Sequence, residues 1–100
     1  MPVVMYMEWD GVEPSQYDEA RNRVNWEGDP PPGAILHVPW FVSGGLRVTD
    51  VWESGEDFQR FVDQRLMPAV TEIGIEGQPR VDIQPLHSRV FAPAIEKVTA

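Results

Sequence analysis

Residues 34–54 of this chain read AILHVPWFVSGGLRVTDVWES, and this stretch decides the fold. Two apolar runs rich in β-branched and aromatic residues, 34–42 and 46–53, flank the small residues Ser43, Gly44 and Gly45. Glycine reaches the positive φ angles of a tight turn without steric cost, so the pattern predicts a β-hairpin. Pro39 has no N–H to give to a neighbour, which places its strand at a sheet edge or at a bulge.

Upstream of the hairpin the sequence predicts a strand and then a helix. Residues 2–9 form an apolar run that ends at Asp10-Gly11, which is typical of a strand followed by a turn. A helix is expected over about 14–26, because Pro14 suits a first helical turn and the apolar positions recur at helical spacing. Three consecutive prolines within 27–33 predict an extended connector.

Downstream, Ser54 and Asp57 are typical of a helix N-terminus, and Gly74 suits a left-handed C-cap. Pro68 lies inside this helix and removes one backbone hydrogen bond, so we expect a kink there. Residues 81–90 predict the last strand, and 91–100 form a short C-terminal tail. One apolar stripe is expected to face the core: Phe58, Phe61, Val62, Leu66, Ala69, Val70 and Ile73.

The order strand, helix, strand, strand, helix, strand predicts one α+β domain over 1–100 with the ferredoxin-like βαββαβ fold. Its two helices cover one face of a four-stranded antiparallel sheet. The other face needs a cover, and a second copy of the same chain supplies the simplest one. We therefore expect a homodimer that closes a dimeric α+β barrel.

Charge and composition exclude several classes of function. Sixteen acidic residues against eight basic ones give a net charge of −8, which disfavours nucleic acid and anionic membranes as partners. No apolar run approaches the roughly 20 residues of a membrane span, and the start lacks the basic region of a signal peptide. A cytoplasmic protein is expected. The chain has no cysteine and no phosphate-binding glycine loop, so we expect no cofactor.

The segment 48–54, ending in Trp52-Glu53-Ser54 and leading into a helix that carries Phe58, resembles the dimeric α+β barrel proteins related to antibiotic biosynthesis monooxygenases. Element order and length match over roughly residues 2–90. The resemblance implies that Trp52 lines a small-molecule pocket. Some members use an Asn on the first strand and a His on the second helix; this chain has Tyr6 and Glu8 near the former place and no His in that helix.

The hairpin also suggests a catalytic site. With a loop of two or four residues, paired positions sum to an odd number, and His37, Asp50 and Trp52 share one face of the sheet. His37 would then be a general base whose tautomer Asp50 fixes, and Trp52 would be the wall against which a flat substrate stacks. A three-residue loop with a bulge would place His37 on the opposite face. Alternatively, Asp50 and His37 are structural residues.

Three further residues are candidates. His87 is expected in the last strand, on the side of Ile83 and Pro85, where it faces either the pocket, as an alternative base to His37, or the partner subunit. Tyr6 and Glu8 share one face of the first strand and are candidate substrate-binding residues, Glu8 also for proton transfer. A site of two histidines and one carboxylate has no supporting spacing, so no metal is expected.

Two functions follow from these residues. The first is a cofactor-free enzyme that oxygenates, isomerises or cyclises a hydrophobic or aromatic metabolite. The second is a non-catalytic dimer that binds a small ligand or has a structural role, with its histidines already hydrogen-bonded inside a closed pocket.

Overall fold

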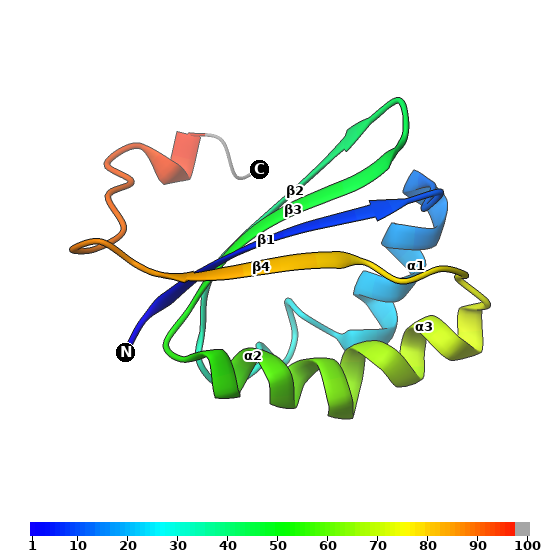
Figure 1. The fold of residues 1–100 in the computed structure, drawn as a ribbon, viewed down its shortest axis with the longest axis horizontal. Coiled ribbons are helices and arrows are strands. Elements are labelled where there is room, and N and C mark those ends of the chain that lie inside the picture. The colour runs from blue at the N-terminus through cyan, green and yellow to red at the C-terminus, as the bar shows by residue number, and fades with distance from the viewer. Residues whose placement is uncertain (98–100) are drawn as a thin grey trace.

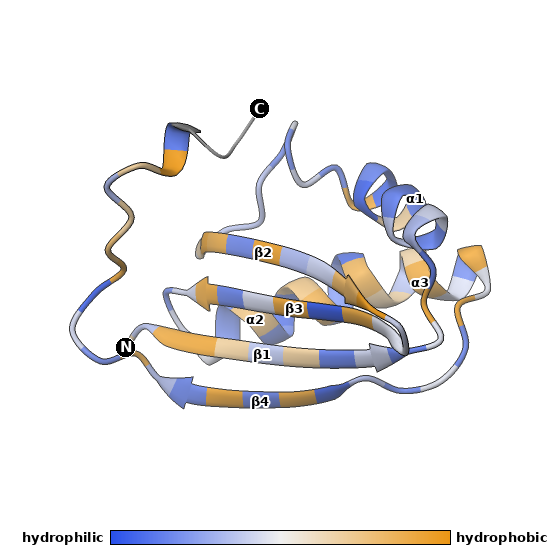
Figure 2. Ribbon diagram, turned by 90° about the horizontal axis from the view of Figure 1, so that it is seen from above, coloured by the Kyte–Doolittle hydropathy of each residue, from blue (hydrophilic) through white to orange (hydrophobic). Residues whose placement is uncertain are grey.

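The computed structural model describes residues 1–97, in which two layers pack together (Figure 1). One layer is a four-stranded antiparallel sheet with the strand order β2-β3-β1-β4, and the helices lie on one of its faces (Figure 2). The ferredoxin-like βαββαβ order is thereby confirmed. The elements are β1 (Val3–Asp10), α1 (Pro14–Val24), β2 (Ala34–Val42), β3 (Gly45–Trp52), α2 (Gly55–Phe61), α3 (Met67–Ile73) and β4 (Arg80–Pro85).

Strand β2 lies at an edge of the sheet, as Pro39 predicts. It also carries an irregularity, since the pairing with β3 shifts by one residue between Ala34 and Leu36. Helix α1 ends at Val24, two residues earlier than expected, because Asn25 adopts a left-handed conformation with φ 55°. Asn tolerates this conformation better than most residues and so terminates the helix.

The second helical stretch begins as predicted, with the Ser54 hydroxyl accepting the backbone N–H of Asp57 at 3.1 Å. It ends at Gly74, whose φ of 87° makes it the left-handed C-cap. The disturbance expected at Pro68 takes the form of a π-helical segment, Val62–Leu66, between α2 and α3. A wider helical turn is one way for a chain to accommodate a missing backbone donor.

The last strand is shorter than the sequence predicts, because β4 ends at Pro85 rather than at residue 90. Its partner β1 begins at Val3, which pairs with Pro85, and one more backbone hydrogen bond, from Leu86 N–H to the Pro2 oxygen, follows the ladder. The prediction that His87 lies in this strand is therefore wrong. Residues 86–97 extend on the side of the sheet opposite the helices (Figure 1), and the predicted tail at 98–100 falls outside the described residues.

The core lies between the sheet and the helices. It is formed by alternate residues of the central strands and by the predicted helix stripe, of which Phe58, Phe61, Ala69 and Val70 are buried. Within residues 1–97 no helix is long and apolar enough to cross a membrane.

Candidate active site

The hairpin between β2 and β3 has a two-residue turn, because Val42 pairs with Gly45. In this register His37 pairs directly with Asp50, and Asp50 pairs on its other side with Met5 of β1. Directly paired residues share a face of the sheet. His37 and Asp50 therefore both lie on the helix-covered face, as the parity argument for a two-residue loop predicts.

Asp50 connects the two aromatic side chains predicted beside it. Its Oδ1 lies 2.7 Å from His37 Nδ1, and its Oδ2 accepts the Trp52 indole N–H at 3.0 Å. Trp52 is fully buried. Asp50 is 3% exposed and is the one buried charged residue among the described positions. A carboxylate held by two N–H donors has a fixed orientation, so Asp50 can fix the imidazole in turn.

A fourth member of this chain of contacts comes from α1. The Tyr17 hydroxyl lies 2.6 Å from His37 Nε2, so both ring nitrogens of His37 have partners. Helical spacing in the sequence places Tyr17 on the apolar face of α1 with Ala20 and Val24. No sequence signal pairs that face with β2 in particular, so Tyr17 did not emerge as a site residue.

The direction of the hydrogen bonds follows from the acceptors. Because a carboxylate has no hydrogen to give, His37 Nδ1–H donates to Asp50. A neutral imidazole then has only Nε2 as an acceptor, and the Tyr17 O–H donates to it. Burial raises the pKa of Tyr17 to about 12, against the opposing effect of Arg21 and with smaller contributions from Asp50 and Asp18. The phenol thus keeps its proton at neutral pH.

An apolar cavity of about 80 Å³ lies beside these groups, between the sheet and the helices. One water needs roughly 10–15 Å³ of such space, so the cavity has room for several waters, and it must widen to hold an aromatic ring, since a cavity of about 150 Å³ binds benzene. Its walls are apolar apart from Arg21 and the three connected side chains Tyr17, His37 and Asp50. An apolar cavity with a few convergent polar groups is typical of a small-molecule site.

Aromatic rings form the support behind the imidazole. The Trp26 ring centroid lies 4.6 Å from that of His37, and Trp26 packs edge-on against Trp52 and Phe61. Trp26 is thus a packing residue and also lines the cavity. Trp52, expected from the sequence as the wall of the pocket, is not among the residues that line this cavity; it packs against Trp26 and Phe61, which do line it.

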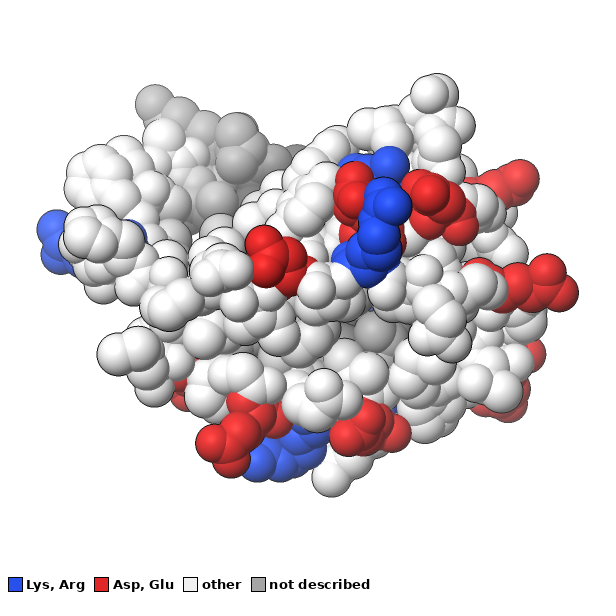
Figure 3. Space-filling view, viewed as in Figure 1, with Lys and Arg blue, Asp and Glu red and all other residues white. Residues whose placement is uncertain are grey.

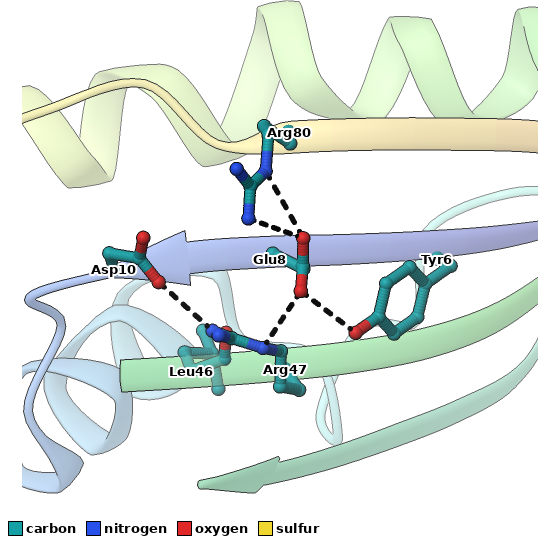
Figure 4. A network of polar contacts seen from close by, with 6 residues as sticks. All are labelled: Tyr6, Glu8, Asp10, Leu46, Arg47 and Arg80. Carbon is teal, nitrogen blue, oxygen red and sulfur yellow. Dashed lines mark hydrogen bonds and ion pairs between the residues drawn. The ribbon is translucent and has the colours of Figure 1, made fainter. Parts of the chain in front are cut away.

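Tyr6 and Glu8 lie on the opposite face of the sheet, away from this cavity. Figure 4 shows Glu8 at the centre of a polar cluster, where it accepts from Tyr6 and pairs with Arg47 and Arg80. Arg47 also reaches Asp10. His87 is exposed and lies beyond β4. The structure therefore brings together His37, Asp50 and Trp52, and separates them from Tyr6, Glu8 and His87.

The surface charge agrees with the composition. On the face shown in Figure 3, the basic side chains form no continuous patch: those at the upper centre and at the bottom stand next to acidic ones, and one at the left edge stands apart. Within residues 1–97, no three side chains of His, Cys, Asp or Glu gather as ligands of a metal ion would.

These features define a ferredoxin-like domain with a cavity between sheet and helices. Solved structures with this fold include antibiotic biosynthesis monooxygenases, so the resemblance drawn from the sequence is confirmed at the level of fold. Comparison of the sequence with protein-family models finds no match, and comparison with curated proteins finds none either.

Three solved structures illustrate the likeness. A protein of unknown function from Nitrosomonas europaea is 14% identical, with a TM-score of 0.63 over 93% of this chain and 95% of that one. SnoaB, a cofactor-independent oxygenase from Streptomyces nogalater, is 17% identical, with a TM-score of 0.56 over 92% and 95%. A monooxygenase from the gene ActVA-Orf6 of Streptomyces coelicolor, in complex with nanaomycin D, is 13% identical, with a TM-score of 0.57 over 91% of each chain.

Proposed function

We propose that this protein is a small-molecule enzyme that binds a hydrophobic, aromatic substrate in the cavity and removes a weakly acidic proton from it. His37 is the general base, Asp50 holds the imidazole in the required tautomer, and Trp52 fixes Asp50. The observation that carries this proposal is the 2.7 Å contact between His37 Nδ1 and Asp50 Oδ1 beside an apolar cavity. General bases of this kind contribute about 100-fold to 10,000-fold in rate.

Among the reactions that begin with proton removal, we propose oxygenation without a cofactor. SnoaB, with the same fold, is a cofactor-independent oxygenase, which favours this choice over isomerisation or cyclisation. A substrate carbanion formed beside an aromatic ring reacts with O₂ as the second substrate. One oxygen atom converts a CH₂ group to a carbonyl, and the other leaves as water with the two hydrogens, so atoms and electrons balance.

The experiment is oxygen consumption with a panel of hydroxylated naphthalenes and anthracenes. His37→Gln is expected to lower kcat/KM by about 100-fold or more, and Asp50→Asn by a smaller factor. Tyr6→Phe, on the opposite face of the sheet, is the matched control and should leave the rate unchanged. Equal rates in wild type and His37→Gln would contradict the proposal.

A homodimer is part of the same proposal. The sheet face away from the helices exposes several large side chains, including Tyr6 (38%), Val38 (43%) and Trp40 (39%). Exposed aromatic and branched residues gathered on one face are typical of an interface. The cluster of Figure 4 lies on this face and contains two acidic residues, Glu8 and Asp10, paired with two basic ones, Arg47 and Arg80. A second copy that covered the face would therefore bury charges that are already paired.

A second candidate is a ligand-binding protein without catalysis. It is favoured by one observation, that both ring nitrogens of His37 are already hydrogen-bonded within the chain. On this alternative the panel compounds bind but are not consumed, and His37→Gln leaves their affinity unchanged.

A further inference from the structure

The base proposed above cannot be reached directly in this structure. His37 Nδ1 is held by Asp50, Nε2 by the Tyr17 hydroxyl, and the Trp26 ring packs against the imidazole. A substrate in the cavity therefore meets no free nitrogen of His37. The polar atom at the end of the chain of contacts is the Tyr17 oxygen, on a side chain that also lines the cavity.

We propose that Tyr17 is a catalytic residue that contacts the substrate and relays its proton to His37. This inference rests on the proposed function, and it narrows the substrate class to a phenol or enol whose O–H can reach the Tyr17 oxygen. The phenolic oxygen donates its one hydrogen to Nε2 and keeps lone pairs for a second partner. An incoming O–H can donate to these lone pairs.

The relay balances as follows. The substrate O–H bond breaks and a new O–H bond forms on Tyr17, while the original Tyr17 O–H bond breaks and an N–H bond forms on His37 Nε2. The imidazole becomes an imidazolium, and the substrate becomes a phenolate or enolate. Asp50 then faces the positive ring through its 2.7 Å contact with Nδ1, which stabilises the charge produced.

The surroundings of Tyr17 suit a relay better than a permanent base. Burial raises its pKa to about 12, so a tyrosinate is not held in the free protein at neutral pH. The charged groups that act on it are Arg21 and Asp18 of its own helix and Asp50 of β3. Arg21 also lines the cavity, and its guanidinium forms an ion pair with Glu27 at the surface.

The test uses 4-nitrophenol, whose yellow anion reports its own ionisation. Wild type, Tyr17→Phe, His37→Gln and the control Tyr6→Phe are titrated with the probe at a pH where free 4-nitrophenol is mostly neutral. The relay predicts that wild type and Tyr6→Phe ionise the bound probe. It also predicts that Tyr17→Phe loses this ionisation at least tenfold, to the level of His37→Gln.

The outcomes separate the two proposals. If Tyr17→Phe ionises the probe as wild type does while His37→Gln does not, His37 remains the base and the relay is overturned. If wild type yields no more anion than His37→Gln, the assignment of His37 as the base is wrong, and the relay through Tyr17 is overturned as well. Circular dichroism and thermal unfolding are the check that Tyr17→Phe, which keeps the ring, is folded.

Discussion

Asp50 is the residue on which the site depends, because its two oxygens hold two different ring N–H groups. We predict that Asp50→Asn destabilises the fold by about 1–3 kcal/mol, since the amide turns a donor toward His37 or Trp52 and leaves a buried N–H unsatisfied. Urea denaturation measures this. Asp10→Asn, whose side chain is 68% exposed, should change stability by less than about 0.5 kcal/mol.

Tyr17 leads to a prediction about pH. Its pKa is raised from 10.0 in the unfolded chain to about 12 by burial, so the folded state holds the phenolic proton more tightly. The resulting stability is fully present below pH 10 and is lost as the pH rises toward 12. We expect the free energy of unfolding, followed by urea titration across this range, to fall more steeply in wild type than in Tyr17→Phe. Identical slopes would contradict this account.

At this scale the sequence predicted part of the site. The parity of His37 and Asp50 across a two-residue turn follows from strand geometry alone, so these residues and Trp52 were found together. Tyr17 was missed because its contact with His37 depends on how α1 packs across the sheet. His87, Tyr6 and Glu8 lie apart from these residues, because the end of β4 and the face of β1 are set by tertiary pairing.

Among the elements, the β2–β3 hairpin sets the register that joins His37 to Asp50. Gly45 has a φ of 141°, and a Cβ there would lie 2.5 Å from the backbone oxygen of Trp9. Gly45→Ala is therefore predicted to cost about 1–3 kcal/mol and to disturb the His37–Asp50 contact. At Gly44, the nearest atom to an added Cβ is 3.8 Å away, so Gly44→Ala is the matched control. Equal thermal stability of both variants would refute this reading.

Helix α2 depends on its N-cap. The Ser54 hydroxyl accepts the Asp57 N–H and donates to the Asp57 carboxylate at 2.9 Å. These contacts, with Arg60, lower the pKa of the Asp57 carboxyl. Ser54→Ala should cost about 1 kcal/mol, measured by chemical denaturation, while Ser54→Thr keeps the hydroxyl and most of the stability. A Ser54→Ala variant as stable as wild type would show that packing alone fixes the start of this helix.

Several features of the elements were predictable because a local residue sets them, although the end of α1 at Asn25 was not. Pro39, Ser54 and Gly74 each act through their own backbone or side chain, and each has the predicted role in the structure. The end of β4 and the π-helical segment before Pro68 were not predictable in detail. Both depend on tertiary contacts of the backbone, and the periodicity of apolar residues in the sequence does not specify those contacts.

For the whole molecule, the proposed dimer gives a direct prediction. Native mass spectrometry should give twice the 11.3 kDa chain mass. Trp40→Glu places a charge on the exposed sheet face and should shift the protein to monomer. Gln59→Glu, on the outer surface of α2, adds the same charge elsewhere and should leave the dimer intact. If the wild-type protein is a monomer, the proposal that a second copy covers this face of the sheet is contradicted.

The central claim is that Asp50 holds His37 with its proton on Nδ1, so that Nε2 is the basic atom facing Tyr17. The most direct measurement is ¹⁵N NMR of the His37 ring in the free protein at neutral pH, assigned by comparison with His37→Gln. The account predicts a protonated Nδ1 and an unprotonated Nε2. A ring with its proton on Nε2 would contradict it.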